Sequence, residues 1–165
     1  MLLSELIQRD MIKCDLEAVD KWAAIEELVD HLIAVHELRI GDRQDVIDAV
    51  FERERSLSTG LEHSLAVPHG AGDFVSDILG CIGISKKGIP FDSLDGKDAR
   101  LIVLLLIPKD AFQHHVRTLA GIARLARNPK FRERILAAED ADQAMDAIIE
   151  LETYEESRSA EKDDA

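Results

Sequence analysis

The sequence predicts a single α/β domain built on a mixed β-sheet, and three observations support this. The 165 residues, 46% of them hydrophobic and 32% charged, suit one globular domain with one sizeable core. Short apolar segments typical of strands alternate with longer segments of helical periodicity, which indicates layered helices and strands. The dipeptide at residues 95–96, Asp-Gly, is a strong hairpin signal, so the sheet should include antiparallel neighbours.

The first third of the chain predicts one strand followed by two helices. Residues 11–16 are largely apolar and typical of a strand. Asp20 then provides the N-cap of an amphipathic helix, because apolar side chains recur after it with a period of 3.6 residues. Trp22 belongs to this apolar stripe and is interpreted as a core residue. Residues 41–42, Gly-Asp, end that helix and cap a second one, which should end near Arg53.

Strands are expected in the middle of the chain, after a loop of breaker residues. They span residues 65–67, 78–85 and 101–107. The segments between the last two are rich in turn formers, in keeping with a hairpin. None of the apolar runs approaches the roughly 20 residues that a membrane-spanning helix needs, so we expect no membrane insertion.

The last third predicts helices and then an acidic tail. His115 lies on the apolar face of a helix that residues 128–129, Asn-Pro, should end. Shorter helices are expected over 131–137 and about 142–152. Residues 155–165 mix acidic residues, Ser and Lys without apolar periodicity, so we expect the domain over residues 1–154 and a disordered tail of no assigned function.

Charge and cysteine usage exclude several classes of function. A net charge of −13 argues against nucleic acid as a partner, because phosphates would be repelled. The start of the chain lacks the basic and apolar pattern of a signal peptide. Cys14 and Cys81 both lie in apolar, strand-like segments, and we interpret them as buried thiols of a cytoplasmic protein.

Residues 58–70, Ser-Thr-Gly-Leu-Glu-His-Ser-Leu-Ala-Val-Pro-His-Gly, contain the most informative histidine. Proline favours extended geometry in the residue before it, so Val67 should end a strand and His69 should begin the exit turn. Gly70 would then supply backbone freedom to that turn. A lone Pro-His-Gly is most simply a surface histidine in a turn, and only its surroundings make it a candidate nucleophile.

Those surroundings form an ordered set of motifs. Arg53-Glu54 and Ser-Thr-Gly at 58–60 precede Pro-His-Gly at 68–70, and His-Val-Arg-Thr-Leu-Ala at 115–120 begins a helix. The set closely resembles the enzyme IIA domain of the phosphoenolpyruvate:sugar phosphotransferase system, in its fructose/mannitol class, which includes nitrogen-regulatory IIA proteins. The resemblance extends to about residue 152. It implies a central mixed sheet, about five strands, with helices on both faces.

The resemblance also implies a set of site residues. It maps the phosphorylated histidine of the family onto His69, the second active-site histidine onto His115 and the active-site arginine onto Arg53. Thr59 matches the threonine of Ser-Thr-Gly and is expected to hydrogen-bond a histidine ring, and Gly70 completes the expected site. One departure concerns the turn before the strand: Ser64 stands where the family usually has Gly, which would alter the turn geometry.

The residues themselves suit phosphoryl transfer, although each has a simpler explanation. A neutral imidazole is a good nucleophile at pH 7, and a second imidazole and a guanidinium would stabilise charge on the moving oxygens. His115 could instead be a half-buried histidine on an apolar helix face, and Arg53 a charge at a helix C-terminus. A zinc site is disfavoured by the histidine spacing, and we expect neither metal nor cofactor.

The implied partners are proteins, because the chain lacks a Gly-x-x-x-x-Gly-Lys nucleotide loop. The phosphocarrier protein HPr would donate the phosphoryl group. The next acceptor would be a IIB domain on a separate chain if the protein serves sugar uptake. The alternative is a regulatory IIA protein, whose phosphorylation controls binding to partners such as kinases or transporters. The residues leave this choice, and the sugar, open.

Overall fold

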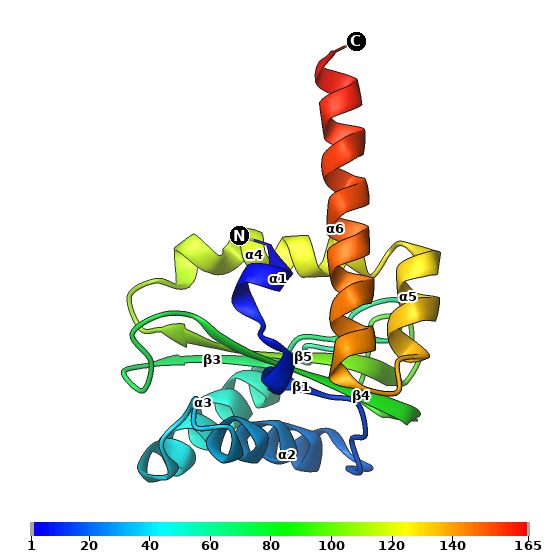
Figure 1. Cartoon of the computed structure of the whole chain (residues 1–165). Helices are drawn as coiled ribbons and strands as arrows, with labels where there is room; N and C mark the ends of the chain where they lie inside the picture. The colour runs from blue at the N-terminus through cyan, green and yellow to red at the C-terminus, as the bar shows by residue number, and fades with distance from the viewer. Residues whose placement is uncertain (1, 165) are drawn as a thin grey trace.

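A mixed five-stranded sheet forms the centre of the computed structural model, which describes residues 2–164 (Figure 1). The strands are β1 (Ile12–Lys13), β2 (Leu65–Ala66), β3 (His69–Gly72), β4 (Leu79–Ile89) and β5 (Ala99–Pro108). The helices are α1 (Leu3–Leu6), α2 (Lys21–Ala34), α3 (Arg43–Ser56), α4 (Phe112–Leu125), α5 (Pro129–Leu136) and α6 (Ala141–Asp163). The predicted fold class is confirmed.

The strand order in the sheet is β1-β4-β5-β2, and β3 also pairs with β5. β4 and β5 are antiparallel, as the hairpin signal predicted, whereas β1, β2 and β3 run parallel to their neighbours. The strand side chains from Leu101 to Ile107 are buried, because helices cover both faces of β5. α2 and α3 lie against one face, and α1, α4, α5 and α6 lie on the other (Figure 1).

The α2 helix begins as the sequence predicts. The Asp20 carboxylate accepts a hydrogen bond from the backbone N–H of Ala23 at 2.9 Å. Trp22 is half-buried and packs edge-to-face on Phe51 of α3, with ring centroids 5.0 Å apart. This aromatic pair joins the two helices on their side of the sheet, so Trp22 is a packing residue.

The chain around His69 differs from the prediction. His69 begins strand β3 rather than an exit turn, and it pairs with Leu105 of β5. β2 ends at Ala66, and Pro68, which has no N–H to donate, separates the two strands. Gly70 has no positive φ. It is needed for space, because a Cβ there would lie 2.9 Å from Cγ2 of Val50 in α3.

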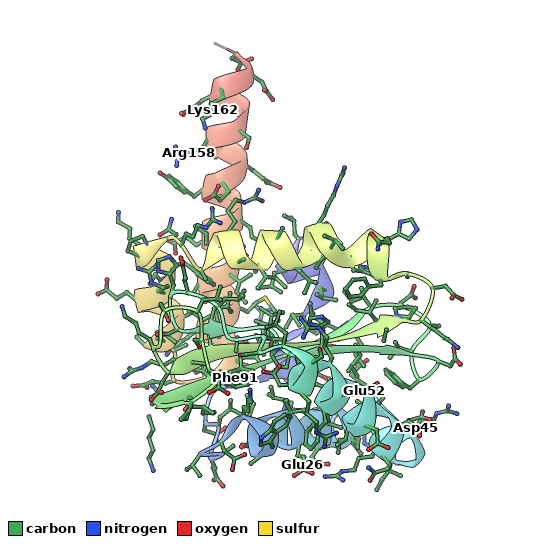
Figure 2. The ribbon with its side chains drawn as sticks, turned by 180° about the vertical axis from the view of Figure 1, so that it is seen from behind. Glu26, Asp45, Glu52, Phe91, Arg158 and Lys162 are labelled. Atoms are coloured by element: carbon green, nitrogen blue, oxygen red, sulfur yellow. The ribbon has the colours of Figure 1, made fainter. Side chains whose placement is uncertain are left out.

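The last helix extends further than the sequence indicated. α6 continues to Asp163, whereas irregular structure was expected from residue 155. The segment contains helix-forming Glu, Lys, Arg and Ala side chains, which favour continuation of the helix. Arg158 and Lys162 lie on the part of α6 that stands clear of the sheet (Figures 1 and 2). Packing therefore contributes little to this last stretch.

Both cysteines are buried free thiols, in agreement with the prediction. Burial raises the pKa of Cys81 to about 12, so this thiol is protonated at neutral pH. Within residues 2–164, no helix combines the length and the apolar character that crossing a membrane requires.

Candidate functional site

His69 is held in one orientation at the start of β3. The residue is only 7% exposed, and its Nδ1 lies 2.9 Å from the carbonyl oxygen of Val67. A carbonyl oxygen can only accept a hydrogen bond, so Nδ1 carries the hydrogen and donates it. In the neutral ring, the lone pair is therefore on Nε2.

The surroundings of the imidazole keep it neutral. Burial lowers the pKa of His69 from its ordinary value, the hydrogen bond to Val67 acts in the opposite direction, and the charge of Arg53 lowers the pKa further. The negative charge of Glu54 raises it, but the net pKa remains below the ordinary value. A ring that is uncharged at pH 7 retains its nucleophilic lone pair.

Helix α4 begins beside this ring. The Phe112 ring stacks with the His69 imidazole, with centroids 6.0 Å apart and planes inclined by 28°. His115 lies three residues further along α4 and is half-buried. Residues three apart lie on one side of a helix, so His115 lies on the same side of α4 as Phe112, the residue that stacks on His69.

Arg53 lies in the last turn of α3. The Arg53 Nη1 donates to the carbonyl oxygen of Leu57 at 2.6 Å, which ties the side chain to the end of its own helix. The loop after α3 then runs antiparallel to the segment before His69: the Val67 N–H donates to the Thr59 carbonyl at 3.1 Å, and Gly60 pairs with Ala66. Arg53 thus makes the helix-end contact that the sequence left as one alternative, and its charge lowers the pKa of His69.

Glu54 is a buried carboxylate in this region, and the sequence alone predicts no role for it. The residue is 2% exposed. It accepts hydrogen bonds from the Thr59 hydroxyl at 2.6 Å and the Thr59 N–H at 3.0 Å. Lys21 of α2 lies 3.2 Å from it and 3.0 Å from Asp92. The signal that pointed to it was its place directly after Arg53 in the Arg-Glu motif.

Thr59 therefore has a different partner from the expected one. Its hydroxyl donates to Glu54, whereas the family resemblance predicts a bond to a histidine ring. The described contacts of His69 involve Val67 and Phe112. Thr59 fixes the loop that leads to His69, because its side chain and its backbone N–H both bind the buried carboxylate.

The turn before β2 carries the departure noted at Ser64. His63 and Ser64 have φ values of 63° and 59°, both in the left-handed region. Glycine adopts such values without steric cost, whereas a side chain at these angles is strained. The Ser64 carbonyl nevertheless accepts hydrogen bonds from the N–H groups of Arg100 and Leu101, so the turn stays attached to β5.

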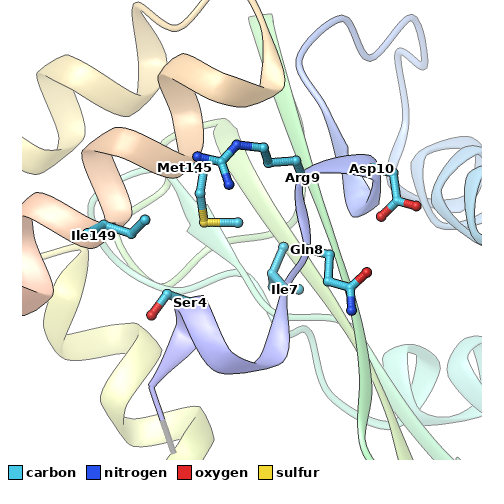
Figure 3. A pocket seen from close by; sticks show the side chains of 7 residues that line it. All are labelled: Ser4, Ile7, Gln8, Arg9, Asp10, Met145 and Ile149. Carbon is cyan, nitrogen blue, oxygen red and sulfur yellow. The ribbon is translucent and has the colours of Figure 1, made fainter.

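The surface depression shown in Figure 3 belongs to a different part of the molecule. It lies between the N-terminal segment and α6 and has a volume of about 450 Å³. Residues 4 and 7–10, together with Met145 and Ile149, line it. It contains none of the sequence-predicted site residues, and we assign it no role in the chemistry of His69.

The fold and the region around His69 are those of a candidate phosphoryl carrier: the imidazole is neutral, its pKa is lowered by the charge of Arg53, and it stacks on a helix that carries a second histidine. The model of the family "Phosphoenolpyruvate-dependent sugar phosphotransferase system, EIIA 2" matches residues 5–151. The chain belongs to this family of phosphoryl-carrying transferases.

Relatives and a solved structure agree with this assignment. The fructose-specific EIIA component of Haloferax volcanii is 31% identical, with 90% of this chain and 96% of the relative aligned. The fructose-specific EIIABC component of Bacillus subtilis is also 31% identical; the match covers 90% of this chain and 23% of that longer protein. The crystal structure of nitrogen regulatory protein IIA-Ntr from Neisseria meningitidis superimposes with a TM-score of 0.78 at 28% identity, covering 88% of this chain and 98% of that one.

Proposed function

We propose that His69 accepts a phosphoryl group on Nε2 from the phosphohistidine of HPr and passes it on. The observation that carries the proposal is the tautomer: Nδ1–H is engaged by Val67, so the lone pair is on Nε2. In the transfer, the Nε2 lone pair bonds to phosphorus as the bond to the donor's ring nitrogen breaks. The positive charge that the ring gains is shared with Nδ1–H, which keeps its acceptor in the Val67 carbonyl.

The supporting roles fall to Arg53 and His115. Phosphoryl transition states are loose, so positioning and stabilisation of the oxygens dominate catalysis. Arg53 is close enough to influence the pKa of His69, and its guanidinium has further N–H groups besides the one on Leu57. His115 lies on the same side of α4 as Phe112, which stacks on His69. We propose that both donate hydrogen bonds to the transferred group.

Gly70 and Thr59 contribute indirectly in this proposal. Gly70 lets β3 approach α3, and Thr59 fixes the loop through Glu54. Neither needs to touch the phosphoryl group, and both keep the backbone around His69 in place.

The domain that we propose for this function spans residues 1–154.

The test is phosphorylation by phosphoenolpyruvate, enzyme I and HPr, comparing the wild type with two histidine variants. His69→Ala removes the acceptor atom and should take up no phosphate. His115→Ala removes a donor to the moving oxygens and should react about 10²–10³ times more slowly, with partial recovery in His115→Gln. Uptake by His69→Ala at the wild-type rate would refute the proposal.

The phosphoryl group on His69 could serve either sugar transport or regulation. The fructose-specific relatives favour transport, with a IIB domain as acceptor, and the longer EIIABC relative is named for IIB and IIC parts on one chain. The 28% identical nitrogen regulatory structure favours a regulatory protein whose phosphorylation controls its partners. Both uses require phosphoenolpyruvate as the phosphoryl source, so we propose that the protein acts in the cytoplasm. Transfer to a purified IIB domain would support transport, whereas a partner that distinguishes wild type from His69→Asp in a pull-down would support regulation.

A further inference from the structure

We propose that Phe112 shields the His69 ring from water, so that the phosphorylated protein gives its phosphoryl group to a protein partner rather than to solvent. The inference rests on the proposed function for the phosphorylated state. The part that concerns the covering of the ring applies to the unphosphorylated protein as well.

The contact between the two rings carries the inference. Their centroids lie 6.0 Å apart and their planes are inclined by only 28°, which is an offset stack. His69 is 7% exposed, while Phe112 is 37% exposed. Phe112 thus packs against the imidazole while part of its own side chain faces solvent, so it lies between the ring and part of the surrounding water.

The position of Phe112 in α4 makes it a separable element. It is the first residue of the helix, and it does not belong to the buried core that holds the sheet together. A single exposed apolar side chain is ordinary on a protein surface, so it is the stack on His69 that distinguishes Phe112. Burial is the largest cause of the lowered pKa of His69, and the Phe112 ring is one of the groups packed against that imidazole.

The chemistry that shielding opposes is hydrolysis. Water would attack phosphorus, the P–Nε2 bond would break, and the imidazole would leave and regain a neutral ring as inorganic phosphate departs. Attack requires a water molecule close to the phosphoryl group, and an apolar ring beside the histidine reduces the number of such waters. A protein donor or acceptor can instead contact the exposed side of Phe112, since apolar side chains are readily buried at interfaces.

The first measurement is the titration of His69 by NMR in the unphosphorylated protein. Phe112→Ala should raise the pKa of His69, because part of the desolvation is removed. Phe112→Tyr keeps the stacked ring and should titrate like the wild type. Ile149→Ala removes an apolar side chain of similar exposure from α6, in the depression that contains none of the predicted site residues, and is the matched control. Thermal melts of each variant check that the fold is retained.

The second measurement is the loss of phosphate from the isolated phosphoprotein in buffer. Phe112→Ala should lose phosphate about two- to tenfold faster, the size expected when one aromatic contact is removed, and Phe112→Tyr should restore the slow rate. An unchanged pKa or an unchanged rate of loss in Phe112→Ala overturns the inference. A wild type that takes up no phosphate would contradict the proposed function, and the titration would still decide whether Phe112 covers the ring.

Discussion

Replacing Glu54 with Gln tests whether the buried carboxylate supports the site. The side chain accepts from the Thr59 hydroxyl, the Thr59 N–H and Lys21. Gln keeps the volume, and the Thr59 hydroxyl can turn to accept from the new amide, so the negative charge is the main loss. Lys21 keeps its contact with Asp92 at 3.0 Å. We therefore expect the loss of about one charge-assisted hydrogen bond, about 1.5–3 kcal/mol of unfolding free energy.

The assay is urea denaturation together with thermal melting, with Glu52→Gln as the control. Glu52 lies on the exposed side of the same helix (Figure 2), so its substitution should change stability by less than about 0.5 kcal/mol. For a chain of this length, the expected loss in Glu54→Gln corresponds to a Tm lower by about 3–12 °C. The pKa of His69 should also fall further, because the charge of Glu54 raises it.

Thr59→Val completes a double-mutant cycle with this substitution. The two changes should couple by about 0.5–3 kcal/mol, since the two side chains are in direct contact: Thr59→Val removes the hydrogen bond and Glu54→Gln removes the charge that strengthens it. If Glu54→Gln were as stable as Glu52→Gln and left the pKa of His69 unchanged, the carboxylate would not support the site and the reasoning would be refuted.

Three further predictions concern the turn, the pH dependence and the tail. Ser64→Gly should stabilise the protein by about 0.5–1 kcal/mol in urea denaturation, because the left-handed φ of 59° costs a side chain about 1–2 kcal/mol and glycine returns part of this as unfolded-chain entropy; a loss of stability would contradict this. The unfolding free energy should decrease as the pH falls from about 7.5 through 6.5, because the unfolded imidazole binds a proton more readily than the folded His69 with its lowered pKa. His69→Asn should weaken this slope, and an equal slope in both proteins would argue against the buried neutral ring. Deleting residues 155–165 should change stability by less than about 0.5 kcal/mol in the same assay, since most of these side chains are exposed; a larger loss would move the proposed domain boundary.

Local patterns predicted much of the fold. The Asp20 cap, the 3.6-residue period of α2 and the hairpin of β4 and β5 depend on neighbours in the sequence or on a short loop. Such features are encoded within a few residues. The order of the motifs around His69 pointed to the candidate site for the same reason, because each motif is short and local.

The missed features depend on distant partners. Strand β3 is a His-Gly-Ala-Gly segment of weak strand propensity, and it exists because β5 lies beside it. Glu54 looks like a surface glutamate in the sequence, because Lys21 comes from another helix. The stack of Phe112 on His69 joins residues 43 positions apart in number, a contact that periodicity within α4 could not reveal.

The central claim is that Nε2 of His69 is the phosphoryl acceptor, and the most direct test is to map the phosphate on the wild-type protein. After incubation with phosphoenolpyruvate, enzyme I and HPr, tandem mass spectrometry locates the modified residue and ³¹P NMR distinguishes the two ring nitrogens. We expect one acid-labile phosphoryl group, on Nε2 of His69, whose Nδ1–H remains on the Val67 carbonyl. Stable phosphate on His115 with none on His69, or phosphate on Nδ1, would contradict it.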